Sequence, residues 1–111
     1  MVTTRVHLGA DLYASPLWSP GLDGKLSNVA LDDYALTPSL KRALERWASR
    51  YDELFEQYGG RFPASQADCT ALDEAGKGLW EELVSELGGH MEIHYDSPIT
   101  GQSTLVHRPS L

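Results

Sequence analysis

Residues 37–58 read TPSLKRALERWASRYDELFEQY, and this stretch, with residues 65–89, decides the fold. Its apolar residues recur at steps of three and four, which is the spacing of one face of an α-helix. They are Leu40, Ala43, Leu44, Trp47, Ala48, Tyr51, Leu54, Phe55 and Tyr58. Thr37 suits the N-cap and Pro38 the first helical position. The pattern therefore predicts a helix over residues 38–58 that Gly59-Gly60 ends.

Residues 65–89, SQADCTALDEAGKGLWEELVSELGG, predict a second helix over Gln66–Leu87. Ser65 is the expected N-cap, and Asp68 three residues later resembles a capping box. Its apolar stripe is Cys69, Leu72, Gly76, Leu79, Leu83 and Leu87. Glycine at position 76 costs about 1 kcal/mol against alanine, so we expect the first helix to approach there closely. Because residues 59–64 are few, the helices should form an antiparallel hairpin.

After the second helix the hydrophobic period changes to two. Met91, Ile93 and Tyr95 alternate with polar residues, which predicts a half-buried strand, and Ser103–His107 is expected to return beside it. Three short β-like stretches precede the helices: Arg5–Leu8, Asp11–Tyr13 and Ser27–Leu31. Ser15-Pro16 and Ser19-Pro20-Gly21 are expected to break any regular element between them.

These elements predict an α+β fold, in which a two-helix antiparallel hairpin packs on a small antiparallel β-sheet. With 111 residues the chain has the length of one domain, which we place at residues 1–108, with a loose tail at 109–111. A single cysteine, Cys69, excludes an internal disulfide and is expected to be a packed core thiol. Neither a secretory h-region nor a membrane span is visible, so we expect a cytoplasmic protein.

The sequence holds no convincing catalytic constellation. His90 and His94 have the spacing of a helical zinc motif, but on a strand they would lie about 13 Å apart, too far to share a metal. Residues 21–27 lack the spacing of a phosphate loop, and neither a nucleophile elbow nor a dinucleotide fingerprint is present. We therefore expect a protein that is not an enzyme and uses no cofactor or metal.

Charge is the more informative signal. The formal net charge is −7, which disfavours nucleic acid and anionic membranes as partners and favours a basic protein. The second helix, with six carboxylates against Lys77, carries −5 of that total. Glu82 and Glu86 lie one turn apart near the negative helix end, which opposes local stability. A binding surface would explain this placement, and a solubility face is the alternative. The predicted contact residues are Asp32, Asp33, Asp68, Trp80, Glu82 and Glu86.

Several segments resemble a group of small acidic bacterial proteins, some of them associated with toxin–immunity loci. The resemblance covers residues 13–96, with Gly60–Pro63 shorter than the usual inter-helix loop. It rests on residues 16–18 (PLW), 29–34, 36–40 (LTPSL), 44–48 (LERWA), 51–52, 74–79, 86–88 and 93–95 (IHY). The group supplies no catalytic residue that could be carried over.

The leading hypothesis is an immunity protein that neutralises a cognate bacterial toxin, one that attacks nucleic acid, by electrostatic capture and occlusion of its active site. One alternative is a small metal- or ligand-binding domain or enzyme that uses His90, Glu92 and His94 on the polar strand face. Another is a self-associating protein with Trp18 and Trp80 buried between subunits. The sequence leaves the toxin's identity open, and also whether the protein is a monomer or a homodimer.

Overall fold

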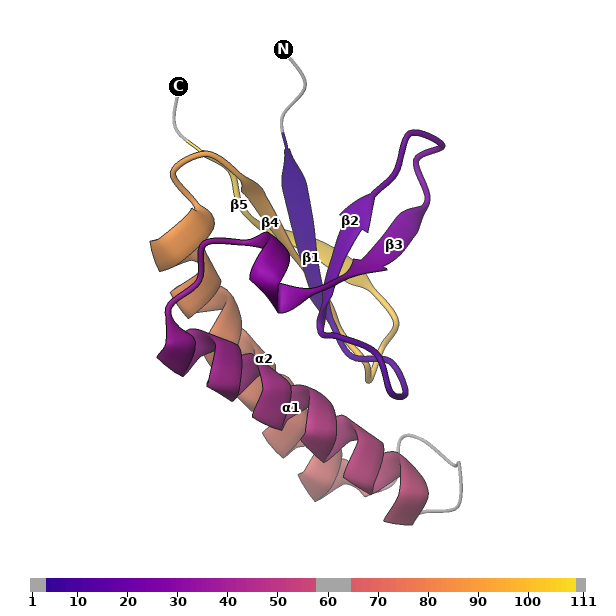
Figure 1. The fold of residues 1–111 in the computed structure, drawn as a ribbon. Helices are drawn as coiled ribbons and strands as arrows, with labels where there is room; N and C mark the ends of the chain where they lie inside the picture. Colours follow the sequence, from indigo (N-terminus) through magenta and orange to yellow (C-terminus); the bar gives the residue numbers. More distant parts are fainter. Residues whose placement is uncertain (1–3, 58–64, 110–111) are drawn as a thin grey trace.

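Two long helices lie on one face of a five-stranded sheet in the computed structural model, which describes residues 4–57 and 65–109 (Figure 1). This arrangement confirms the predicted α+β class. The helices are α1 (Pro38–Gln57) and α2 (Gln66–Leu87), and a short 3-10 turn, η1 (Leu31–Asp33), precedes them. The strands are β1 (Arg5–Gly9), β2 (Leu17–Pro20), β3 (Leu26–Val29), β4 (Glu92–Asp96) and β5 (Ser103–His107).

Both helices begin where the sequence predicts. The Ser65 hydroxyl accepts the backbone N–H of Asp68 at 3.1 Å and donates to its carboxylate at 2.9 Å, which completes the predicted cap of α2. The Thr37 hydroxyl oxygen accepts the N–H of Leu40 at 3.4 Å at the start of α1. The predicted stop at Gly59-Gly60 and the short loop at 60–63 lie outside the described residues.

The sheet has the order β3-β2-β1-β4-β5, and its central pair corrects the prediction of a wholly antiparallel sheet. Strands β1 and β4 run parallel, in a register that pairs Arg5 with Glu92 and Gly9 with Asp96. The other three pairings among the described strands are antiparallel. Parallel neighbours need a long crossover connection, and the helical hairpin between β3 and β4 supplies one.

The N-terminal region holds two further corrections. Strand β2 occupies residues 17–20, so it begins directly after Ser15-Pro16 and includes Ser19 and Pro20 of the segment that we expect to break any element. Pro20 is tolerated because β1 pairs with β2 only at Leu17 and Trp18, so that at Pro20 the strand has a neighbour on one side alone, as an edge strand does. Residues 11–13 are not a strand; they lie in the β1–β2 connection, where Tyr13 has φ 57°.

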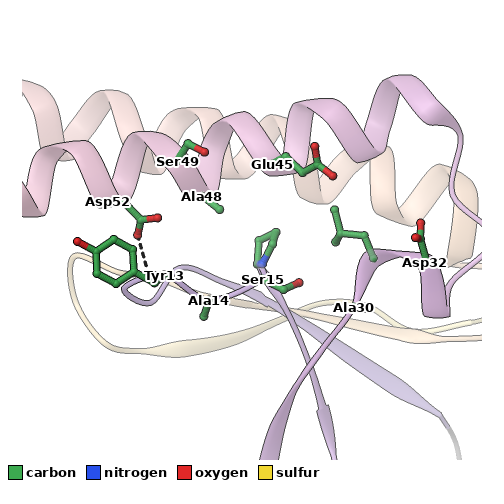
Figure 2. Close-up of a pocket in the computed structure, with 11 residues that line it drawn as sticks. Tyr13, Ala14, Ser15, Ala30, Asp32, Glu45, Ala48, Ser49 and Asp52 are labelled. Carbon is green, nitrogen blue, oxygen red and sulfur yellow. Dashed lines mark hydrogen bonds between the residues drawn. The ribbon is translucent and has the colours of Figure 1, made fainter.

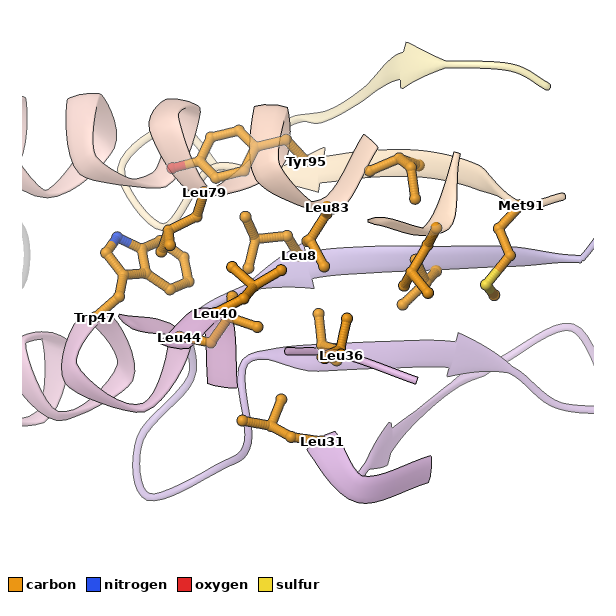
Figure 3. Packing of buried hydrophobic residues seen from close by; sticks show 14 of the residues in the cluster. Leu8, Leu31, Leu36, Leu40, Leu44, Trp47, Leu79, Leu83, Met91 and Tyr95 are labelled. Atoms are coloured by element: carbon orange, nitrogen blue, oxygen red, sulfur yellow. The ribbon is translucent and has the colours of Figure 1, made fainter. Parts of the chain in front are cut away.

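The core lies between the helices and the sheet (Figure 3). Trp47 of α1 donates its indole N–H to the carbonyl of Leu72 in α2 at 2.9 Å, which fixes the helix pair. Cys69 is buried, as predicted. The expectation for Gly76 is wrong in its partner: Tyr95 of β4 approaches it, and a Cβ there would lie 2.5 Å from the Tyr95 hydroxyl.

Candidate acidic binding groove

Three of the four carboxylates of α1 share one flank of the helix. At 100° per residue, the carboxylates of Glu45, Asp52 and Glu56 share one flank. Arg42, Arg46 and Arg50 lie on the neighbouring flank, together with Glu53. Arg46 and Arg50 line the hollow beside α2, where an Arg50 nitrogen lies 3.7 Å from an Asp68 oxygen. The zero total charge of residues 38–58 gives no sign of the acidic flank, so the sequence does not predict it.

The acidic flank of α1 forms one wall of a groove of about 620 Å³, which we call the acidic groove (Figure 2). The opposite wall comes from the β1–β2 connection and from the segment that enters η1. The lining residues are Tyr13, Ala14, Ser15, Pro16, Ala30, Leu31, Asp32, Glu45, Ala48, Ser49 and Asp52. Three of them carry carboxylates and none carries a positive charge.

The three carboxylates differ in their partners. Lys41 contacts Asp32 at 2.9 Å, and this hydrogen bond, with the attraction of the ammonium, holds the pKa of Asp32 below its usual value. Asp52 accepts the backbone N–H of Tyr13 at 2.9 Å (Figure 2). Glu45 is exposed and forms no ion pair with any residue in the described part of the chain. The groove therefore has a negative charge that internal partners only partly compensate.

Tyr13 stands at one end of the acidic groove. Its side chain is 71% exposed, and its φ of 57° lies in the left-handed region that favours glycine. Its hydroxyl donates to Glu56, and this bond, with a smaller effect of burial and of the nearby carboxylates, raises the pKa of Tyr13. Carboxylates of α1 thus hold both the backbone and the ring of Tyr13. Large aromatic residues of this kind commonly anchor protein interfaces.

The structure does not bring the six predicted contact residues into one patch. Asp32 lines the acidic groove, and Asp33 is exposed beside it on η1. Asp68, Glu82 and Glu86 follow the flank of α2 that borders α1, where Asp68 lies near Arg50 and Glu86 accepts from Thr37. Trp80 lies on another flank of α2, half-buried, with its ring centroid 5.0 Å from that of Tyr95.

Asp32 is the one predicted contact among the described residues that line the acidic groove, and its other carboxylates, Glu45 and Asp52, and its aromatic residue, Tyr13, were not predicted. The spacing of the two carboxylates, seven residues apart on one helix face, was the available signal for them. Tyr13 gave no comparable signal, because only the folded chain places it against α1.

The polar face of β4 does not assemble the alternative metal site among the described residues. His94 lies 2.6 Å from a Glu92 oxygen, whereas His90 is exposed in the turn before the strand. The hydrogen bond to His94 is the main cause that lowers the pKa of Glu92, and attraction to His94, Arg108 and Arg5 adds to it. No group of three or more histidine, cysteine, aspartate or glutamate side chains suited to a metal occurs at residues 4–57 and 65–109.

Fold and groove together define a small acidic α+β protein with a negatively charged recess beside its helical hairpin. Residues 4–98 match the family described as Serratia CdiI immunity protein-like, and the chain belongs to this family. Membership confirms the predicted kinship with toxin–immunity proteins. A comparison with curated proteins gave no match. Neither α1 nor α2, the two long helices described, is long and apolar enough to cross a membrane.

Proposed function

We propose that this protein neutralises a cognate toxin by binding it, and that the acidic groove is part of the contact surface. The observation that supports the proposal is the set of three carboxylates around one recess, of which only Asp32 has a cationic partner among the described residues. A toxin that acts on nucleic acid presents a basic cleft to its substrate. The groove would attract that cleft, accelerate association and cover it, and this needs no enzymatic activity of the immunity protein.

The predicted contacts outside the groove extend this surface in two directions. Asp33 adjoins the groove on η1, and Glu82 is exposed on α2. Asp68, Glu86 and Trp80 stay in the proposal, although each also has a structural contact within the chain. We place this binding in the cytoplasm of the producing cell, because the toxin must be neutralised where its nucleic-acid target lies.

Charge reversal tests which carboxylates the toxin contacts. The purified cognate toxin domain is titrated with wild type, Glu45→Lys, Glu82→Lys and Glu81→Lys. All three positions are exposed on helices, so the variants share one change of net charge. We expect Glu45→Lys to weaken binding about tenfold at low salt, mainly through slower association, and Glu82→Lys to weaken it less.

Glu81→Lys is the control, since that position lies outside the predicted contacts and outside the groove lining. If all three variants weaken binding equally, net charge and not the groove governs the association. If the toxin does not bind wild type at all, the proposed function is wrong. Raising the salt concentration should reduce the difference between wild type and Glu45→Lys, because exposed charges are screened.

A further inference from the structure

The sheet has a second face, which lies away from both helices (Figure 1). A buried polar side chain, that of His7, lies on this face. Along β1, Val6 and Leu8 point into the core, and His7 points to the opposite face. His7 is nevertheless only 6% exposed. Trp18 of β2 is its direct cross-strand partner. The imidazole ring of His7 stacks on that of His94, with 4.5 Å between the ring centroids and an angle of 15° between the rings.

His7 is hydrogen-bonded to the carboxylate of Asp96. Its Nδ1 lies 3.0 and 3.1 Å from the two carboxylate oxygens of Asp96, and the Ser103 hydroxyl lies 3.5 Å from the same nitrogen. Because a carboxylate only accepts, Nδ1 carries the proton and donates it. Nε2 is buried with no hydrogen-bond partner among the described residues. An apolar residue at position 7 would avoid that unsatisfied atom but would leave the Asp96 carboxylate without this donor, so the role of the imidazole is to hold that carboxylate in place.

Beside Asp96 the same face contains a hollow of about 290 Å³, which we call the sheet pocket. Trp18 forms one wall, and its indole N–H donates to the carbonyl of Gly9 at 3.0 Å, which fixes the orientation of the ring. Leu26 and Pro98 supply apolar surface. A Cβ at Gly9 would lie 3.1 Å from the Cβ of Asp96, so the glycine lets that side chain occupy its place.

The lining of the sheet pocket is acidic. Asp96 and Asp11 both line it, and none of the described lining residues is a lysine or an arginine. The side chain of Asp96 is 27% exposed, so its carboxylate is partly desolvated yet still accessible. A cation that reached it would meet a fixed carboxylate and a fixed indole ring.

We propose that the sheet pocket binds a lysine or arginine side chain of the toxin. The cationic head would pair with Asp96 and lie against the ring of Trp18, because a carboxylate and an aromatic face both attract a cation. Its aliphatic stem would cover Leu26. His7 is a positioning residue that orients the carboxylate. The assignment of this side chain to the toxin rests on the proposed function, whereas the affinity of the pocket for a cation does not.

The pocket chemistry is testable without the toxin. The ¹⁵N-labelled protein is titrated with N-acetyl-L-lysine methylamide, N-acetyl-L-arginine methylamide and the uncharged norleucine analogue, and the indole N–H signals are followed by NMR. The Trp47 and Trp80 indoles lie in α1 and α2 and serve as internal references. We expect a saturable shift of the Trp18 signal with either cation, with a dissociation constant on the order of 1–10 mM. Norleucine should give no shift.

Asp96→Asn is the matched variant, because its amide oxygen can still accept from His7 while the charge is removed. It should weaken binding of the cationic probes at least about fivefold. A Trp18 signal that does not move at tens of millimolar, or that moves equally with norleucine, overturns the proposal. So does an Asp96→Asn protein that binds the cations like wild type.

Toxin-binding measurements then test whether the toxin supplies the cation. Asp96→Asn should weaken toxin binding about tenfold, and His7→Leu should weaken the binding of both the toxin and the cationic probes, because the carboxylate loses the donor that orients it. If Glu45→Lys weakens binding and Asp96→Asn does not, the acidic groove is upheld and the sheet pocket is not the toxin's contact. A His7→Leu protein with reduced stability and unchanged probe binding contradicts the positioning role.

Discussion

The carboxylate of Glu86, near the end of α2, accepts two hydrogen bonds from Thr37, the residue that caps α1. The backbone N–H of Thr37 donates at 2.7 Å and its hydroxyl donates at 2.8 Å. Position 86 is unfavourable for a carboxylate by local rules, since Glu82 and the negative helix end both repel it. The contact with Thr37 accounts for a glutamate at this position, because it joins the end of α2 to the start of α1.

We predict that Glu86→Ala lowers the free energy of unfolding by about 1–2 kcal/mol, because two donors at the start of α1 lose their acceptor. Glu82→Ala, an exposed position one turn away, should change it by less than about 0.5 kcal/mol. Urea denaturation of both variants measures the difference. Equal losses would mean that the contact with Thr37 contributes nothing in solution.

The helices could be predicted from the sequence because their signals are local. The cap at Ser65 and the spacing of the apolar residues in α2 depend only on residues close together in the sequence, and the predicted bounds of α2 match the structure. Strand β2 gives no such signal. Its four residues are ordered by pairing with β1 on one side and β3 on the other, and these pairings depend on the folded chain.

The same difference between local signals and contacts made only in the folded chain applies to the candidate sites. Asp32 was predicted from a run of acidic residues and lines the acidic groove. Glu45 is not among the predicted contacts, because the four acidic and four basic residues at 38–58 cancel in total charge and do not draw attention to that helix. Asp96 and His7 are 89 residues apart, and the parallel pairing of β1 with β4 brings them together. The predicted antiparallel sheet could not have shown that contact.

Two glycines of α2 should respond to alanine with opposite signs. A Cβ at Gly76 would lie 2.5 Å from the Tyr95 hydroxyl, which donates to Asp73 at 2.6 Å, whereas a Cβ at Gly78 would meet open space. Gly76→Ala should therefore lower the free energy of unfolding by about 1–3 kcal/mol through overpacking. Gly78→Ala should raise it by up to about 1 kcal/mol through helix propensity. Thermal and urea unfolding of both variants measure the two signs, and a stabilised Gly76→Ala would contradict the close approach of Tyr95.

Asp96 should make stability depend on acid pH. Burial alone would raise its pKa, but hydrogen bonds from His7 and Ser103, and attraction to the imidazoles of His7 and His94, outweigh burial and leave the pKa below its usual value. The folded state therefore binds this proton more weakly than the unfolded chain, whose aspartate pKa is about 3.9. The stabilisation is fully present above that value and is lost as the pH falls through the lowered pKa.

The difference in unfolding free energy between wild type and Asp96→Asn reports this effect. It should shrink as the pH falls below about pH 4. In a His7→Leu background the pH dependence should be weaker, because the main hydrogen-bond donor is gone. A difference that stays constant down to about pH 3 would contradict the lowered pKa of Asp96.

Two variants at Tyr13 distinguish the effect of backbone strain on stability from the effect of the ring on toxin binding at the acidic groove. Tyr13→Gly and Tyr13→Ala both remove the ring and its bond to Glu56, and both keep the backbone N–H that Asp52 accepts. At φ 57° alanine suffers the steric penalty that glycine avoids, so the glycine variant should be more stable by about 1 kcal/mol. If the ring contacts the toxin, both variants should lose affinity equally despite this difference. Equal stability of the two variants in urea would show that position 13 leaves the left-handed region in solution, and retained affinity in both would remove Tyr13 from the interface.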